Sequence, residues 1–126
     1  MNIRVYFEDT DIGGIVYHTK YINFCERARS ELLFANGLSP FDVALQSGYV
    51  VKSLECDFLK TATLGEILEV RTSLLSKSRV SFTLLQEIFK EEEKIFSMRV
   101  TLVALKNGKP IKLDPQLLAL FEGVDK

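Results

Sequence analysis

The sequence is poor in the residues that bind transition metals or form disulfide frameworks. It holds one histidine and two cysteines, Cys25 and Cys56, without a C-x-x-C pair. One histidine without a cysteine cluster leaves too few ligands for a transition-metal site, so we expect no metal. The two cysteines fall in separate apolar patterns, which is typical of reduced core thiols in a cytosolic protein.

The sequence also lacks the features of proteins that bind nucleic acids or cross membranes. Its 16 Lys and Arg residues nearly balance 17 Asp and Glu residues, giving a net charge of −1, and they are scattered rather than clustered. A nucleic-acid-binding protein would show a basic stripe, and none is visible. No apolar run approaches the roughly 18 residues of a membrane span, and no basic region with an apolar segment marks a secretory signal. We therefore expect a cytoplasmic protein with no membrane span and no nucleic-acid partner.

Common catalytic motifs are absent as well. The G-x-S-x-G motif of serine hydrolases does not occur, and the Gly13-Gly14 pair is far short of a phosphate-binding loop. Cys25 falls on the apolar face of a helical pattern, where burial would raise the pKa of its thiol, so it is a poor nucleophile. Any chemistry has to come from other residues.

Periodicity predicts the elements of the N-terminal half. Alternating apolar and polar residues predict a strand over residues 3–8. A helical period follows over residues 20–36, with Glu26 and Arg29 spaced for pairing on an outer face. A short helical turn is expected around residues 41–46.

The remaining pattern completes an α+β domain. Four strand patterns are separated by short polar breaks, which favour antiparallel hairpins, and Asp114-Pro115 starts a C-terminal helix. This order predicts one domain over residues 1–126, in which a five-stranded antiparallel sheet packs on one central helix. The four patterns cover residues 50–59, 67–75, 80–89 and 95–105.

Carboxylates, glycines and the single histidine gather between the first strand and the long helix. The segment is Glu8-Asp9-Thr10-Asp11-Ile12-Gly13-Gly14-Ile15-Val16-Tyr17-His18. A strand-to-helix junction presents free backbone N–H groups and the positive end of a helix dipole, which stabilise a developing oxyanion. A carboxylate just ahead of it can attack a carbonyl held there, or activate water for that attack. The apolar residues Ile12, Ile15 and Val16 would bury the junction in part. The segment has the outline of an acyl-transfer site.

The same residues have a structural interpretation. Asp and Gly are common in turns, and an Asp ahead of a helix is often its cap. A lone histidine near a helix start is more often structural than catalytic. From the residues alone, both interpretations stay open.

The order of residues in this segment resembles that of a known enzyme family. The run from Arg4 to His18, followed by Tyr21 and Glu26-Arg27-Ala28-Arg29, resembles the hotdog-fold acyl-CoA thioesterases of the 4-hydroxybenzoyl-CoA thioesterase type. Within that type it is most similar to the bacterial branch found with the Tol-Pal genes. The resemblance extends to Ser53-Leu54-Glu55-Cys56-Asp57-Phe58 and covers nearly the whole chain.

The resemblance implies a hotdog fold, with an antiparallel sheet around a long helix, and a homodimer or tetramer with active sites at the dimer interface. It implies that Asp11 is the nucleophile or general base and that the backbone N–H at His18 polarises the carbonyl, with the His18 side chain also in the site. Tyr17 would line the acyl pocket, and Gly13 and Gly14 would contact the substrate. No cofactor is implied, because coenzyme A is part of the acyl-CoA substrate. Acyl carrier protein is an alternative carrier.

The phosphates of coenzyme A need Lys or Arg near the mouth of the pocket. Lys77 and Arg79, which flank a predicted hairpin turn, are candidates, and Lys60 is another. These residues are equally well interpreted as solvated turn charges.

Two other functions compete with thioester hydrolysis. A dehydratase acting on hydroxyacyl thioesters would need an acidic partner for His18 across the helix, and no such pairing is apparent. A non-catalytic acyl-thioester-binding protein would dock an acyl carrier protein in a cell-envelope or lipid-synthesis assembly. The presence of both Asp11 and His18 favours the enzyme.

Overall fold

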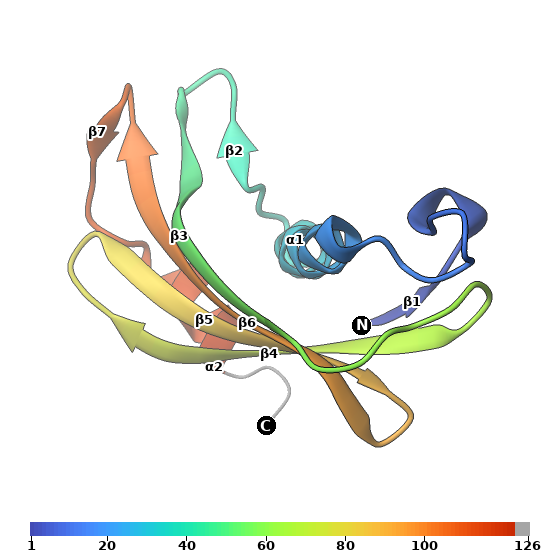
Figure 1. Cartoon of the computed structure of the whole chain (residues 1–126). Coiled ribbons are helices and arrows are strands. Elements are labelled where there is room, and N and C mark those ends of the chain that lie inside the picture. The colour runs from blue at the N-terminus through green and yellow to red at the C-terminus, as the bar shows by residue number, and fades with distance from the viewer. Residues whose placement is uncertain (123–126) are drawn as a thin grey trace.

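An antiparallel sheet curls around one long helix, α1, which lies on its concave side (Figure 1). This computed structural model describes residues 1–122, and the last part of the predicted domain, residues 123–126, lies outside the described residues. The seven strands follow the order β1-β4-β5-β6-β3-β2, with β7 paired to β6, and neighbouring strands are antiparallel. The elements are β1 (Asn2–Arg4), the 3-10 turn η1 (Phe7–Asp9), α1 (His18–Ala35), β2 (Phe41–Asp42), β3 (Ser47–Phe58), β4 (Ile67–Lys77), β5 (Ser81–Lys90), β6 (Glu93–Lys106), β7 (Lys109–Pro110) and α2 (Pro115–Glu122).

The long helix forms where the period predicts it. Helix α1 spans 18 residues, and its buried apolar residues gather along one face. The chain leaves the helix at Asn36, and Gly37 follows with a φ of +75°, a backbone conformation that glycine adopts without steric cost. The buried apolar residues on this face of α1 are Tyr21, Phe24, Cys25, Ala28 and Leu33.

Within residues 1–122, no helix is both long enough and apolar enough to cross a membrane.

The same face of α1 also buries a charged residue. Arg29 is only 9% exposed, and its Nη1 donates a hydrogen bond of 2.8 Å to Oε1 of Gln86 on β5. The amide nitrogen of Gln86 in turn donates to the Cys25 carbonyl and to the Thr72 hydroxyl. The expected surface position of Arg29 beside Glu26 is therefore wrong. Helical spacing shows which residues are neighbours, but not which of them faces the sheet.

The C-terminal helix covers the same face of the sheet. Asp114 caps it, because its carboxylate accepts the Gln116 N–H at 2.9 Å, as the Asp-Pro pair predicts. At the other end of α2, Phe121 stacks on Phe82 of β5 with 5.7 Å between ring centroids. Phe82 and Gln86 point to one face of β5 because side chains alternate along a strand.

The first strand is shorter than predicted. It ends at Arg4 rather than at residue 8, because Asp9 draws the backbone into η1. One carboxylate oxygen of Asp9 accepts the Tyr6 N–H at 2.9 Å, and the Asp9 N–H donates to the Tyr6 carbonyl at the same distance. A local side-chain hydrogen bond thus outweighs the alternating pattern.

The helical turn expected around residues 41–46 is also wrong. The segment begins with β2, which pairs with β3, and then turns through Gln46 at a φ of +51°. Strands β2 and β7 have two residues each, too few to show any period. The α+β architecture is confirmed, with these two short strands added to the five predicted.

Strand β3 presents an unpaired edge. One side of β3 pairs with β6 along its length, while the other side meets β2 only at Ser47 and Gly48. No other strand within residues 1–122 covers positions 50–58 on that side. Val51 is 47% exposed and Phe58 is 49% exposed. An apolar edge of this length is prone to pair with another strand.

Candidate active site

The loop between η1 and α1 folds back on itself. Thr10 and Val16 form an isolated antiparallel bridge, and the Tyr17 N–H donates to the Asp9 carbonyl at 2.9 Å. Asp9 is 5% exposed, with one carboxylate oxygen bound to the Tyr6 N–H. Asp9 therefore holds the loop in shape and brings the start of α1 next to Asp11.

Asp11 begins a tight turn. Its carbonyl accepts the Gly14 N–H at 3.0 Å, and its own N–H donates to the Ile15 carbonyl at 2.9 Å. Gly14 has a φ of +78°, where a side chain would be strained, and the Gly13 N–H donates to Oδ1 of Asp11 at 2.9 Å. Gly13 and Gly14 thus shape the turn and orient the Asp11 carboxylate, whose side chain is exposed.

Asp11, Tyr17 and His18 line one open pocket of about 360 Å³. The opposite wall comes from the end of β3 and the connection that follows it. The His18 ring lies 4.6 Å from the Tyr17 ring and 6.1 Å from that of Phe58, measured between centroids. The structure thus brings together the predicted catalytic residues, Asp11 and His18, and the predicted acyl-pocket residue, Tyr17. The remaining lining residues are Ile15, Val16, Tyr21, Phe58, Leu59, Lys60 and Thr61.

His18 is the first residue of α1. Tyr17 before it is extended, with φ −66° and ψ 134°, and caps the helix without a side-chain hydrogen bond. No acceptor within residues 1–122 takes the His18 N–H. A free N–H at the positive end of an 18-residue helix can donate to an oxygen that gains negative charge.

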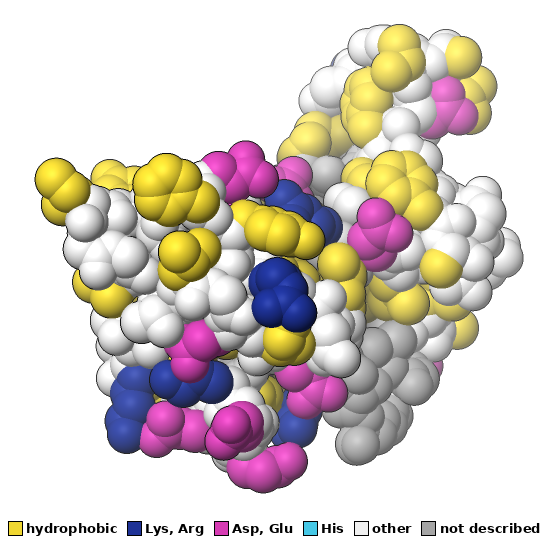
Figure 2. Space-filling model, turned by 90° about the vertical axis from the view of Figure 1, so that its right-hand side faces the viewer, with side chains coloured by type: hydrophobic (Ala, Val, Ile, Leu, Met, Phe, Trp, Pro, Cys, Tyr) yellow, Lys and Arg dark blue, Asp and Glu magenta, His cyan; other side chains and the backbone are white. Residues whose placement is uncertain are grey.

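The pocket is more exposed than the apolar residues of the loop predict. Val16 is buried, but Ile15 is 37% exposed and Ile12 is fully exposed. Figure 2 shows large hydrophobic side chains at the surface on the side of the molecule that carries β1 and this loop. The expected contribution of Ile12 to the partial burial of the junction is therefore wrong for the single chain, because nothing in the described residues covers it, whereas Val16 is buried and only 37% of Ile15 is exposed.

The other candidate cations lie in different places. Lys60 lines the pocket and pairs with Glu93 at the start of β6 at 2.6 Å. Lys77, at the end of β4, lies 3.4 Å from Glu122 of α2. Neither Lys77 nor Arg79 lines the pocket of Asp11 within the described part of the chain. Of these candidates, only Lys60 stands at the pocket in a single chain.

The remaining nucleophile and metal candidates are accounted for. Cys25 is fully buried, and burial raises the pKa of its thiol to about 12, which confirms that it is a poor nucleophile. Within residues 1–122, no three side chains of the His, Cys, Asp and Glu types gather closely enough to hold a metal ion.

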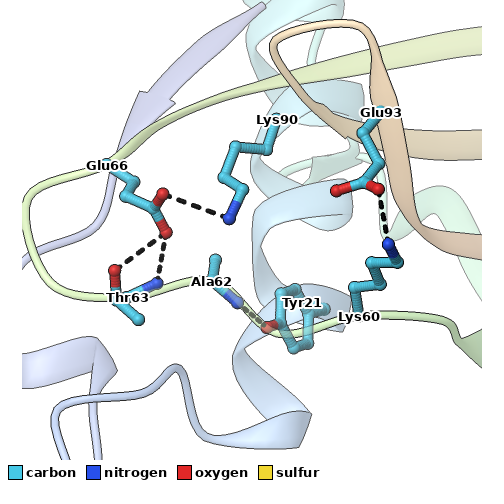
Figure 3. A network of polar contacts seen from close by, with 7 residues as sticks. All are labelled: Tyr21, Lys60, Ala62, Thr63, Glu66, Lys90 and Glu93. Carbon is cyan, nitrogen blue, oxygen red and sulfur yellow. Dashed lines mark hydrogen bonds and ion pairs between the residues drawn. The ribbon is translucent and has the colours of Figure 1, made fainter.

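The β3–β4 connection supports the loop from behind. The Tyr21 hydroxyl accepts the Ala62 N–H at 2.9 Å, and Glu66 accepts the Thr63 N–H at 2.6 Å (Figure 3). Burial raises the pKa of the Tyr21 hydroxyl. Partial burial acts to raise the pKa of Glu66, but the hydrogen bonds from Thr63 and the charge of Lys90 hold it below its ordinary value. The period of the flanking strands does not predict this support, although Thr63 and Glu66 have the spacing of a capping box.

Comparisons with known proteins place the chain among enzymes of one family. Residues 13–97 match the model of the thioesterase superfamily. The chain is 34% identical to the acyl-CoA thioester hydrolase YbgC of Escherichia coli O6:H1 over 117 residues, which cover 92% of this chain and 86% of the relative. It is 43% identical to the acyl-CoA thioesterase YbgC of Helicobacter pylori strain 26695 over 89 residues, which cover 71% of this chain and 65% of the relative.

Solved structures show the same fold. A protein of Aquifex aeolicus superimposes with a TM-score of 0.87 at 28% identity, covering 97% of this chain and 98% of that chain. A Bartonella henselae protein described as a probable thioesterase gives a TM-score of 0.83 at 30% identity, covering 90% of this chain and 97% of that chain. The expected sheet around a long helix is thus confirmed as the hotdog fold, and the chain belongs to the thioesterase superfamily.

Proposed function

We propose that this protein hydrolyses acyl-CoA thioesters to a free acid and coenzyme A. The observation that carries the proposal is that the exposed Asp11 and His18, whose N–H has no acceptor within residues 1–122, line one pocket. The names of the Escherichia and Helicobacter relatives support the same substrate class. A nucleophilic or basic oxygen beside a preorganised donor is the arrangement that acyl transfer needs.

Asp11 supplies the attacking oxygen or the base. In the covalent route, a carboxylate oxygen of Asp11 attacks the thioester carbonyl, the thiolate of coenzyme A leaves, and water hydrolyses the mixed anhydride. In the direct route, Asp11 takes a proton from water as that water attacks the carbonyl. Both routes leave the free acid and coenzyme A, and both need the Asp11 carboxylate ionised and accessible.

The start of α1 stabilises the carbonyl oxygen. Negative charge develops on that oxygen as the carbonyl carbon becomes tetrahedral, and a fixed N–H donor there needs no reorganisation during the reaction. The His18 N–H is such a donor because the first N–H of a helix has no partner within the helix. The His18 ring, packed beside Tyr17, contributes positioning and not the principal electrostatic stabilisation.

We propose a dimer built by pairing β3 with β3 of a second copy. Antiparallel pairing along positions 50–58 would cover the exposed apolar edge and join two sheets into one. With the two-fold axis at the middle of that stretch, Val50 of one chain would face position 58 of the other, beside the pocket. A second copy would thereby close a pocket that is open in the single chain.

The same dimer gives Lys77 and Arg79 a role. Ser81, next to their turn, is level with Val103 of β6, which is level with Val50 of β3. In the dimer this turn would therefore approach the level of the other chain's pocket. We propose that this turn binds the phosphates of coenzyme A there, together with Lys60 at the pocket itself.

The cytoplasmic location of the protein stays a prediction, and so does acyl carrier protein as an alternative carrier of the acyl group.

The purified protein should release free thiol from at least one member of a panel of short-chain, long-chain and aromatic acyl-CoAs. A thiol reagent measures the release, and an Asp11→Asn preparation made in parallel controls for contaminating hydrolases. If the wild-type protein binds acyl-CoA but releases thiol no faster than the variant, the non-catalytic acyl-thioester-binding function is correct instead.

Asp11→Asn should lower kcat by ~100-fold or more while substrate still binds, because the amide is neither nucleophile nor base. Asp9→Asn keeps an oxygen that accepts the Tyr6 N–H, so its kcat should fall by no more than about 3-fold. Steady-state kinetics on both variants, with thermal unfolding to confirm the fold, test the assignment. Equal and modest losses in the two variants would contradict it.

The two roles of His18 can be separated. His18→Ala removes the ring and keeps the N–H, so measurable activity should remain. His18→Pro also removes the N–H, and the site accepts proline because position 18 opens the helix and Tyr17 is extended. We expect kcat of the proline variant to be ~10- to 100-fold below that of the alanine variant. Complete inactivity of a folded alanine variant would show that the ring is the main catalyst.

Light scattering should give at least the mass of two chains, with activity lost on dilution below the dimer dissociation constant. Leu54→Lys places a charge on the β3 edge and should produce an inactive monomer. Leu75→Lys is the matched control, since Leu75 is 46% exposed against 40% for Leu54 but lies on β4. A species of one-chain mass with full specific activity would overturn the interface model.

A further inference from the structure

The loop that carries Asp11 rests on one short segment of the β3–β4 connection. The Val16 N–H donates to the Ala62 carbonyl at 2.9 Å, and the Leu64 N–H donates to the Gly14 carbonyl at 3.0 Å. Between these hydrogen bonds, Ile15 lies opposite Thr63 in an isolated antiparallel bridge. This bridge lies outside the main strands, so the position of residues 62–64 sets the position of residues 14–16.

Glu66 fixes that segment from the side away from the loop. Thr63 uses neither its N–H nor its hydroxyl in the bridge, and both donate to Oε1 of Glu66, at 2.6 and 2.9 Å. The second carboxylate oxygen of Glu66 lies 3.3 Å from Nζ of Lys90, at the end of β5. Figure 3 shows Glu66 between Thr63 and Lys90. Glu66 thus ties the connection to the main sheet.

Both reacting groups depend on the segment that Glu66 holds. The Asp11 N–H donates to the Ile15 carbonyl at 2.9 Å, and the Gly14 N–H donates back to the Asp11 carbonyl at 3.0 Å. Val16 is joined through Tyr17 to His18, where α1 begins. Attack on a bound carbonyl needs the carboxylate and the N–H in the correct relative position. A misplacement of about 1 Å can lower the rate ~10²-fold.

We propose that Glu66 is a positioning residue for thioester hydrolysis: its bonds to Thr63 and Lys90 hold residues 14–16, and through them the Asp11 carboxylate and the N–H of His18, at their working separation. The proposal rests on the proposed function of Asp11. Glu66 does not line the pocket and acts only through the backbone.

The protein should stay folded without Glu66. The Tyr21 hydroxyl still accepts the Ala62 N–H at 2.9 Å, and the Gly65 N–H still donates to the Val5 carbonyl at 2.9 Å. Glu66 is partly exposed, so water can reach the Thr63 N–H when the carboxylate is removed. The expected change is a loosening of residues 14–16.

Glu66→Ala removes all three contacts, whereas Glu66→Gln keeps an oxygen that can accept both bonds from Thr63. We expect kcat to fall ~10-fold in the alanine variant, with KM for acyl-CoA within about 2-fold, and rescue to within about 3-fold of wild type in the glutamine variant. Glu87→Ala is the matched control: Glu87 pairs with Lys94 at 3.0 Å, and its side chain is 23% exposed against 29% for Glu66. This control should keep kcat within about 2-fold.

A double-mutant cycle tests whether Glu66 acts through Asp11. In an Asp11→Asn background, Glu66→Ala should cost no more than about 2-fold, because the carboxylate whose separation from the His18 N–H it sets is gone. A full ~10-fold loss in that background would overturn the proposal. A raised KM with unchanged kcat, or a glutamine variant as impaired as the alanine variant, would overturn it too.

Amide hydrogen exchange provides a readout that is independent of activity. Glu66→Ala should accelerate exchange at Val16 and Leu64 by ~10-fold, and Glu87→Ala should not. If Glu66→Ala does not fold, Thr63→Val and Lys90→Met each remove one contact and should each accelerate exchange at the same amides. Unchanged exchange would overturn the positioning role. If Glu66→Ala accelerates exchange at these amides but the wild-type protein hydrolyses no acyl-CoA, the proposed function is overturned, and with it the catalytic role of Glu66.

Discussion

The packing of α1 into the concave face of the sheet is the constraint on which the site depends. Tyr21, Phe24 and Cys25 are each no more than 3% exposed, so the first turns of the helix cannot shift without opening the core. The helix start at His18 is therefore a fixed point. The Asp11 loop and the β3–β4 connection are assembled around it, and Tyr21 contributes both to the core and to that connection.

Burial separates the roles of two aspartates that are only two positions apart. Asp9 is buried, and its carboxylate accepts a hydrogen bond from the Tyr6 N–H, which fixes the turn before the loop. Asp11 is exposed and lines the pocket, and its contact with the Gly13 N–H occupies one carboxylate oxygen. A buried carboxylate with a structural partner is costly to change for stability. An exposed one at a pocket is available for chemistry.

The candidate site and the proposed assembly share one element. The end of β3 supplies Phe58 to the pocket, and the same strand has the unpaired apolar edge. Covering the edge with a second copy would enclose the pocket and exclude water from it. Lower water content strengthens the interaction of the His18 N–H with a developing oxyanion. In this arrangement, the second copy covers both the pocket and the β3 edge, which is why both are open in the single chain.

The sequence by itself determined the parts that rest on local order. The period of residues 20–36 predicted α1, alternation predicted the four long strands, and the segment ending at His18 pointed to Asp11. Each of these signals lies within a short window, where spacing alone decides which side chains share a face.

Only the tertiary structure decided how distant segments meet. Arg29 turned inward to Gln86, 57 positions away, because the sheet offered a hydrogen-bond acceptor there. Lys60 reached the pocket while Lys77 did not, although Lys60 lies just after β3, Lys77 lies at the end of β4, and both carry the same charge. Glu66 became part of the site's support because the β3–β4 connection packs under the Asp11 loop. Contacts of this kind join residues that share no sequence window, so no local period encodes them.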